Sequence, residues 1–119
     1  MTVTRLVLVL VVAAALRPPP LGAHAFLDHA EPRVGAVVAA PKAVTLWFTE
    51  PIEPAFSRIE VDGPDKKPVS TPPLEHPEPR VLSVTLPDLG PGEYQVRWSV
   101  VSVDTHPTDG KFSFEIERR

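Results

Sequence analysis

The sequence contains no cysteine, and Met1 is its only methionine. Disulfide bonds and zinc sites made of thiolates are therefore excluded. Small exported domains commonly use disulfides, so this chain has to be held together by the packing of its core.

The sequence also lacks an apolar run long enough to cross a bilayer as a helix, which takes about 20 residues. Its longest apolar run, Leu6–Leu16, has 11 residues and follows the basic residue Arg5. A short run of this kind, followed by small residues, is typical of a secretory signal peptide that is removed after export. We therefore predict a signal peptide over residues 1–23 and a single domain over residues 24–119.

The end of the leader offers two cleavage sites. A cut after Ala25 has the more typical pattern of small residues at alternate positions, whereas a cut after Ala23 is also compatible with it. The two products differ in whether His24 is kept. The leader residues leave this choice open.

An excess of basic residues is missing too, because the chain has 12 Lys and Arg against 15 Asp and Glu. Arg5 and Arg17 lie in the leader, so residues 24–119 carry a net charge of about −5. Nucleic-acid binding needs a basic surface, and we expect no nucleic-acid partner. The 96 residues after the leader are enough for one domain and one modest core.

Helices of normal length are improbable because 16 prolines interrupt the chain. Between the prolines, apolar and polar residues alternate with the period of half-buried strands. The alternating apolar residues are Val44, Leu46 and Phe48; Ile59 and Val61; Leu82, Val84 and Leu86; Tyr94, Val96, Trp98 and Val100; and Phe112, Phe114 and Ile116. With a first strand near residues 26–30, six to seven short strands are predicted, with turns at residues 62–65, 72–73, 76–79 and 87–92. The fold class expected is all-β: a small Greek-key β-sandwich or barrel, immunoglobulin-like or cupredoxin-like.

Candidate ligands for a metal ion follow the strand expected over residues 94–103. If the backbone stays extended there, Asp104 and His106 point to the same side. Pro107 restricts His106 to extended conformations, and we expect Gly110 to permit the turn before a last strand over 111–117. Taken alone, this pattern also fits an ordinary solvated turn.

The position of His24 favours the metal site. If the leader is cut after Ala23, His24 becomes the first residue, and its α-amine and imidazole can bind one metal ion together. With His106 this gives three nitrogen donors, and Asp104 adds a carboxylate oxygen. Such a set suits Cu(II) in a tetragonal arrangement. The amine and imidazoles must be deprotonated to bind, so binding should weaken as the pH falls.

Three stretches identify a resemblance to the CopC-type periplasmic copper-resistance proteins: "HAFLDHAEPRVGA", "VTLWFTEPIEPAFSRIEV" and "YQVRWSVVSVDTHPTDGKFSFEI". The resemblance covers residues 24–119. It implies a β-sandwich that carries Cu(II), begins with a histidine, and binds the ion through that residue and a Ser-x-Asp-x-His-Pro motif. The matching residues are His24, Asp104 and His106, with Ser102 in the expected place.

The resemblance has further implications. It favours cleavage after Ala23, periplasmic localisation, and delivery of copper to a CopD-type membrane protein. It makes Glu50 an outer ligand or a group that orients the ligands. Thr105 stands where the family often has glycine, which should stiffen the turn. Some members carry a second, methionine-rich Cu(I) site, which this chain should lack because Met1 is removed with the leader.

Two alternatives to a monomeric copper carrier stay open. An N-terminal histidine chelate is also the copper set of oxidative polysaccharide-cleaving enzymes, although a domain of 96 residues leaves little room for their flat substrate surface. A metal-free immunoglobulin-like interaction domain is the other, and it predicts no effect of changing His24 or His106. We expect a protein that is not an enzyme. His29 and His76 are interpreted as a strand histidine and a loop histidine, and Trp47 and Trp98 as packing residues.

Overall fold

The computed structural model describes residues 24–69 and 71–118, which form eight strands and one short 3-10 turn, η1 (Pro54–Phe56). The predicted signal peptide, residues 1–23, lies outside the described residues. In the part described, no helix is long and apolar enough to span a membrane.

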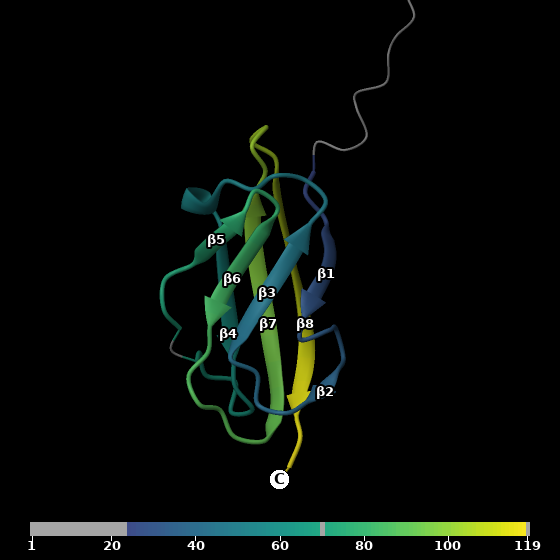
Figure 1. Ribbon diagram of the computed structural model, residues 1–119, viewed down its shortest axis with the longest axis vertical. Coiled ribbons are helices and arrows are strands. Elements are labelled where there is room, and N and C mark those ends of the chain that lie inside the picture. Colours follow the sequence, from purple (N-terminus) through teal and green to yellow (C-terminus); the bar gives the residue numbers. More distant parts are fainter. Residues whose placement is uncertain (1–23, 70, 119) are drawn as a thin grey trace, which may run out of the picture.

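The strands form two four-stranded sheets that pack face to face (Figure 1). The first sheet contains, in spatial order, β1 (Leu27–Glu31), β3 (Ala43–Phe48), β6 (Val81–Thr85) and β5 (Glu75–Glu78). The second contains β2 (Val37–Val38), β8 (Pro107–Ile116), β7 (Gly92–Val101) and β4 (Arg58–Asp62). The predicted all-β sandwich is confirmed. The structure has eight strands instead of the expected six to seven. The sequence pattern did not indicate β2, which has only two residues, or β5, which contains a proline.

The core lies between the sheets and is built from the alternating residues of the sequence. In β3, Val44, Leu46 and Phe48 are buried while the residues between them are partly exposed. The same alternation holds along β7 and β8. Every second side chain of a strand therefore points to the inner face of its sheet. Burial of the two inner faces against each other holds the sandwich together without disulfides.

The segment His76–Pro79 is not a turn, as the prolines suggested, because most of it belongs to the edge strand β5. All four residues of β5 are exposed, and among the described strands only β6 pairs with it. An edge strand tolerates proline because one row of its backbone amides has no partner strand. His76 is therefore an exposed strand residue, and its Nε2 lies 3.1 Å from the carbonyl oxygen of Pro79.

The long hairpin of β7 and β8 pairs from Val101 and Pro107 down to Gly92 and Ile116. This corrects two expectations: β7 ends earlier than residue 103, and β8 begins at Pro107 instead of residue 111. Residues 102–103, expected to end a strand, and residues 104–106, expected to begin a turn, together form the connection between β7 and β8. That connection lies at one end of the sandwich, next to the start of the described chain (Figure 1).

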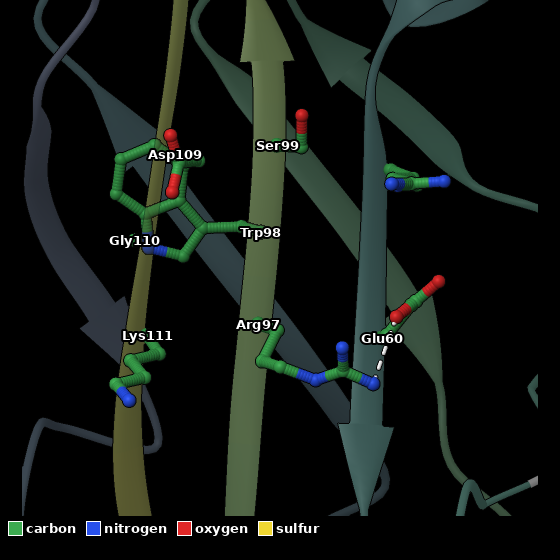
Figure 2. A pocket seen from close by; sticks show the side chains of 8 residues that line it. Glu60, Arg97, Trp98, Ser99, Asp109, Gly110 and Lys111 are labelled. Atoms are coloured by element: carbon green, nitrogen blue, oxygen red, sulfur yellow. Dashed lines mark ion pairs between the residues drawn. The ribbon is translucent and has the colours of Figure 1, made fainter.

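Gly110 does not form a turn but lies inside β8, opposite Trp98. The indole of Trp98 covers it, as Figure 2 shows, and a Cβ at this position would lie 2.5 Å from Cζ2 of the ring. Trp98 is 9% exposed and meets the ring of Phe48 edge-on at 5.3 Å. The predicted packing role of Trp98 is thus confirmed, and the glycine provides space for the ring.

Candidate metal centre

Two segments that are far apart in the sequence meet at the end of the sandwich. The imidazole rings of His24 and His106 have centroids 4.8 Å apart and are tilted by 50°. His24 is exposed, and the side chain of His106 is 46% exposed. The fold therefore brings the two predicted histidine ligands together at a surface that an ion can reach.

The connection between β7 and β8 is a tight turn. The amide of Ser102 donates to the carbonyl of His106 at 3.1 Å, and the amide of Thr105 donates to the carbonyl of Ser102 at 2.8 Å. Thr105 has a φ of +74°, in the left-handed region that favours glycine. The expectation of an extended backbone between Asp104 and His106 is therefore wrong.

The turn nevertheless directs the two side chains toward each other. Oδ1 of Asp104 lies 3.3 Å from Nδ1 of His106. The carboxylate and the imidazole are about half exposed, at 47% and 46%. The pairing that the sequence predicted from an extended strand is thus produced by the turn.

Ser102 supports this arrangement from below. It is 1% exposed, and its hydroxyl donates to Oδ1 of Asp104. Its Oγ also accepts a hydrogen bond from the amide of His106 at 3.3 Å. The hydrogen bond from Ser102 has the largest effect on the pKa of Asp104 and lowers it below its ordinary value. Burial opposes this shift, and the interaction with His106 lowers the pKa further. Asp104 is therefore kept as a carboxylate, the form that binds metal ions.

The chain on the other side of the site is fixed immediately after His24. Ala25 is fully buried, and its carbonyl accepts a hydrogen bond of 2.6 Å from the hydroxyl of Thr108. The amide of Phe26 donates to Oγ1 of Thr49 at 2.9 Å, and the amide of Thr49 donates back to the carbonyl of Phe26 at 2.9 Å. Sequence reasoning missed these contacts, because Thr108 and Ala25 are 83 residues apart and no local pattern links them.

The remaining candidates lie at different distances from the pair of histidines. Glu50 is partly buried and follows Thr49, which places it at the same end of the sandwich. Within residues 24–69 and 71–118, no hydrogen bond or ion pair joins Glu50 to His24, Asp104 or His106. His29 stacks on Trp47 in the neighbouring strand, with centroids 4.4 Å apart, and its Nδ1 lies 2.6 Å from Asp28.

As the side chains stand, no group of three or more histidine, aspartate and glutamate residues in the described parts of the chain is placed to hold a metal ion. His24, Asp104 and His106 are therefore neighbours and not a finished coordination shell. Two imidazoles and one carboxylate at an exposed edge are nevertheless donor types that suit Cu(II). An α-amine at His24 would add a donor that belongs to the main chain.

A second feature, a groove on the outer face of the second sheet, has different chemistry (Figure 2). Arg58, Glu60, Arg97, Ser99, Asp109 and Lys111 line it. Arg97 pairs with Glu60 at 2.9 Å and with Asp62 at 3.0 Å. The charges that line the groove are mixed and partly neutralised, so they select no particular ligand. His24, Asp104 and His106 at the end of the sandwich therefore remain the candidate site.

Comparisons with known proteins identify the family of the chain. The CopC domain family matches residues 27–117. Protein YobA of Escherichia coli K12 is 40% identical over 111 residues, 90% of each chain. Copper resistance protein C of Xanthomonas campestris pv. juglandis is 35% identical over 118 residues, 92% of each chain. The crystal structure of PcoC, a methionine-rich copper resistance protein from Escherichia coli, has a TM-score of 0.73 and 29% identity, covering 80% of this chain and all of that one.

Proposed function

This chain belongs to the CopC family, and from that premise we propose that it is an exported Cu(II) carrier whose single site is built on a mature N-terminal histidine. The ligands are the α-amine and imidazole of His24, the imidazole of His106 and the carboxylate of Asp104. Glu50 acts as an outer ligand or orients the others. The protein binds the ion and passes it on in the periplasm, with a CopD-type membrane protein as the recipient, and carries out no catalysis.

The observation that carries the proposal is the meeting of His24 with the turn over residues 102–106. The ring of His24 lies 4.8 Å from that of His106, and Asp104 accepts a hydrogen bond from the hydroxyl of Ser102. A histidine that begins the chain can close a chelate ring with its own amine, so a small adjustment of three exposed groups completes a tetragonal set. Copper is here the cargo of the protein.

The contacts of Ala25 support a leader that ends at Ala23. Ala25 is fully buried in the core and its carbonyl is held by Thr108. A chain that began at Phe26 would lose this buried residue and the carbonyl as well as the histidine. The domain proposed, residues 24–119, therefore begins one residue before its first buried side chain.

The absence of sulfur ligands distinguishes the proposed site from a methionine-rich one. Met1 is the only methionine and lies in the predicted leader. Thioether ligands select Cu(I), whereas nitrogen and carboxylate donors suit Cu(II). We therefore propose a carrier for the oxidised ion with one site per chain.

A copper titration of protein that begins at His24 tests the proposal. We expect one tight Cu(II) site, which His106→Ala weakens by more than tenfold. His76→Ala is the matched control, because His76 is an exposed histidine on the edge strand β5. Equal affinities of wild type and His106→Ala, or an equal loss in His76→Ala, would refute the ligand set.

A further inference from the structure

The segment after His24 is fastened from both sheets of the sandwich. Thr108 belongs to β8 and shares the inner-facing parity of the buried residues Phe112 and Phe114. Its hydroxyl donates to the carbonyl of Ala25, which leads into β1 of the other sheet. This hydrogen bond therefore joins the two sheets at the end of the sandwich where the candidate metal centre lies.

Thr49 fastens the next residue along the chain. Phe26 and Thr49 exchange two hydrogen bonds of 2.9 Å, one from the amide of Phe26 to the hydroxyl of Thr49 and one from the amide of Thr49 to the carbonyl of Phe26. These bonds extend the pairing of β1 with β3 beyond Leu27 and Phe48. Ala25, between the two fastened groups, is fully buried.

The spacing along β8 explains why this matters for His24. Thr108 lies two residues after His106, so the side chain that holds Ala25 stands next to the proposed ligand. His24 is bonded directly to Ala25, and consecutive Cα atoms are about 3.8 Å apart. Once the carbonyl of Ala25 is held at Thr108, the backbone of His24 stays within reach of His106, and the two ring centroids lie 4.8 Å apart.

We propose that Thr108 is the positioning residue of the N-terminus: its hydrogen bond to the carbonyl of Ala25, assisted by Thr49, holds His24 beside His106 before the ion arrives. The inference rests on the proposed function. A ligand held in its binding position does not have to be ordered when the ion binds, so the affinity of the whole site rises. If the N-terminus frays, the apparent dissociation constant equals the intrinsic one divided by the fraction of molecules that stay binding-competent, so it rises as that fraction falls.

The test compares Thr108→Val, which replaces the hydroxyl by a methyl group, with Thr108→Ser, which keeps it. We expect Thr108→Val to bind Cu(II) about two- to tenfold more weakly, the range set by the net contribution of one hydrogen bond. Its copper EPR spectrum should become heterogeneous as a mobile His24 samples several geometries. Thr108→Ser should restore the wild-type affinity and spectrum.

Thr45→Val is the matched control for general destabilisation. The hydroxyl of Thr45 pairs with that of Ser83 at 3.0 Å on the first sheet, in the middle of β3. This variant should lose stability but bind copper with the wild-type affinity. An equal loss of affinity in Thr45→Val and Thr108→Val would overturn the proposal, because stability alone would then explain it.

Hydrogen exchange of the Phe26 amide gives a readout that needs no copper. That amide is held by Thr49, so we expect faster exchange in Thr49→Val and, through the loosened segment, in Thr108→Val. Wild-type exchange and wild-type affinity in Thr108→Val would overturn the positioning role while the copper site stands. A wild-type protein that binds no copper would overturn the proposed function, and the exchange rates would still decide whether Thr108 holds the segment. If Thr108→Val does not fold, Thr49→Val takes its place in each comparison.

Discussion

Gly110→Ala tests the packing that supports the β7–β8 hairpin. The added Cβ would lie 2.5 Å from Cζ2 and 2.7 Å from Cε2 of Trp98. Carbon atoms pack at about 3.5 to 4.0 Å, so the overlap is about 1 Å. The ring is buried and meets Phe48 edge-on, so it has little freedom to move away.

The expected magnitude follows from two opposing effects. Overpacking of a core costs about 1 to 3 kcal/mol. Because the φ of Gly110 is outside the left-handed region, alanine is tolerated there and restricts the unfolded chain, which returns about 0.4 to 1 kcal/mol. The net loss in the free energy of unfolding should be about 1 to 2 kcal/mol, which lowers the Tm of a domain of this size by about 5 to 15 °C.

Thermal and urea unfolding followed by far-UV circular dichroism measures this loss. Gly90→Ala is the matched control, because no atom of the described residues lies within 4 Å of a Cβ at that position, and it should leave the stability unchanged or slightly raised. Combining Gly110→Ala with Trp98→Phe should cost less than the sum of the two single changes, because the smaller ring relieves the overlap. A Gly110→Ala protein as stable as the wild type would refute the reasoning.

Two further predictions concern hydroxyl groups. Ser102→Ala removes a buried hydroxyl that serves Asp104 and the amide of His106, so we expect a loss of about 1 to 3 kcal/mol in urea unfolding. NMR titration should show that the pKa of Asp104 in this variant rises toward its ordinary value, and an unmoved pKa would contradict the role of Ser102. In the wild type the carboxylate stabilises the fold at pH values above its ordinary pKa, and this contribution is lost as the pH falls through the lowered pKa of the folded state. Tyr94→Phe removes the 2.7 Å hydrogen bond to the carbonyl of Gly90 and should cost about 0.5 to 1.5 kcal/mol. Burial, and to a smaller extent the charge of Asp65, raises the pKa of Tyr94. The protonated phenol therefore stabilises the fold fully at pH values below its ordinary pKa, and this contribution is lost as the pH rises through the raised pKa of the folded state. An ultraviolet titration of Tyr94 with the midpoint of free tyrosine would disprove this.

The inner faces of the sandwich could be predicted from the sequence because strand burial has a fixed period. Val44, Leu46 and Phe48 alternate with polar neighbours, and the structure buries all three. The hairpin residues Tyr94 and Phe114 follow the same rule and stack at 5.6 Å. In a regular strand a side chain two positions away shares the face, so the local pattern identifies the core residues of β3, β7 and β8. In β6 the pattern is insufficient, because its first four residues are all buried.

The local exceptions came from residues that act through a partner strand or through backbone conformation. Gly110 resembles a turn residue in the sequence, but it is needed opposite Trp98, which only the strand register reveals. Pro77 suggested a turn, whereas an edge strand accepts it. Thr105 adopts the left-handed backbone conformation in its turn. A glycine at this position would have indicated that conformation in the sequence, whereas a threonine does not.

The closeness of Asp104 and His106 was predictable from the sequence, but the contacts that support them were not. Their proximity was predicted from an extended backbone, but it is the turn with Thr105 in the left-handed region that places Oδ1 of Asp104 3.3 Å from Nδ1 of His106. Their role as ligands of copper, together with that of His24, stays a prediction. The bond from Thr108 to Ala25 depends on how two sheets pack, and no spacing within one strand encodes it.

The EPR spectrum of the protein loaded with one equivalent of Cu(II) tests the central claim most directly, when protein that begins at His24 is compared with protein that keeps Ala23 before it. We predict a tetragonal spectrum rich in nitrogen coupling for the first, and a spectrum with fewer coupled nitrogens and weaker binding for the second, because its His24 nitrogen is an amide. Identical spectra and affinities from both proteins would contradict the account.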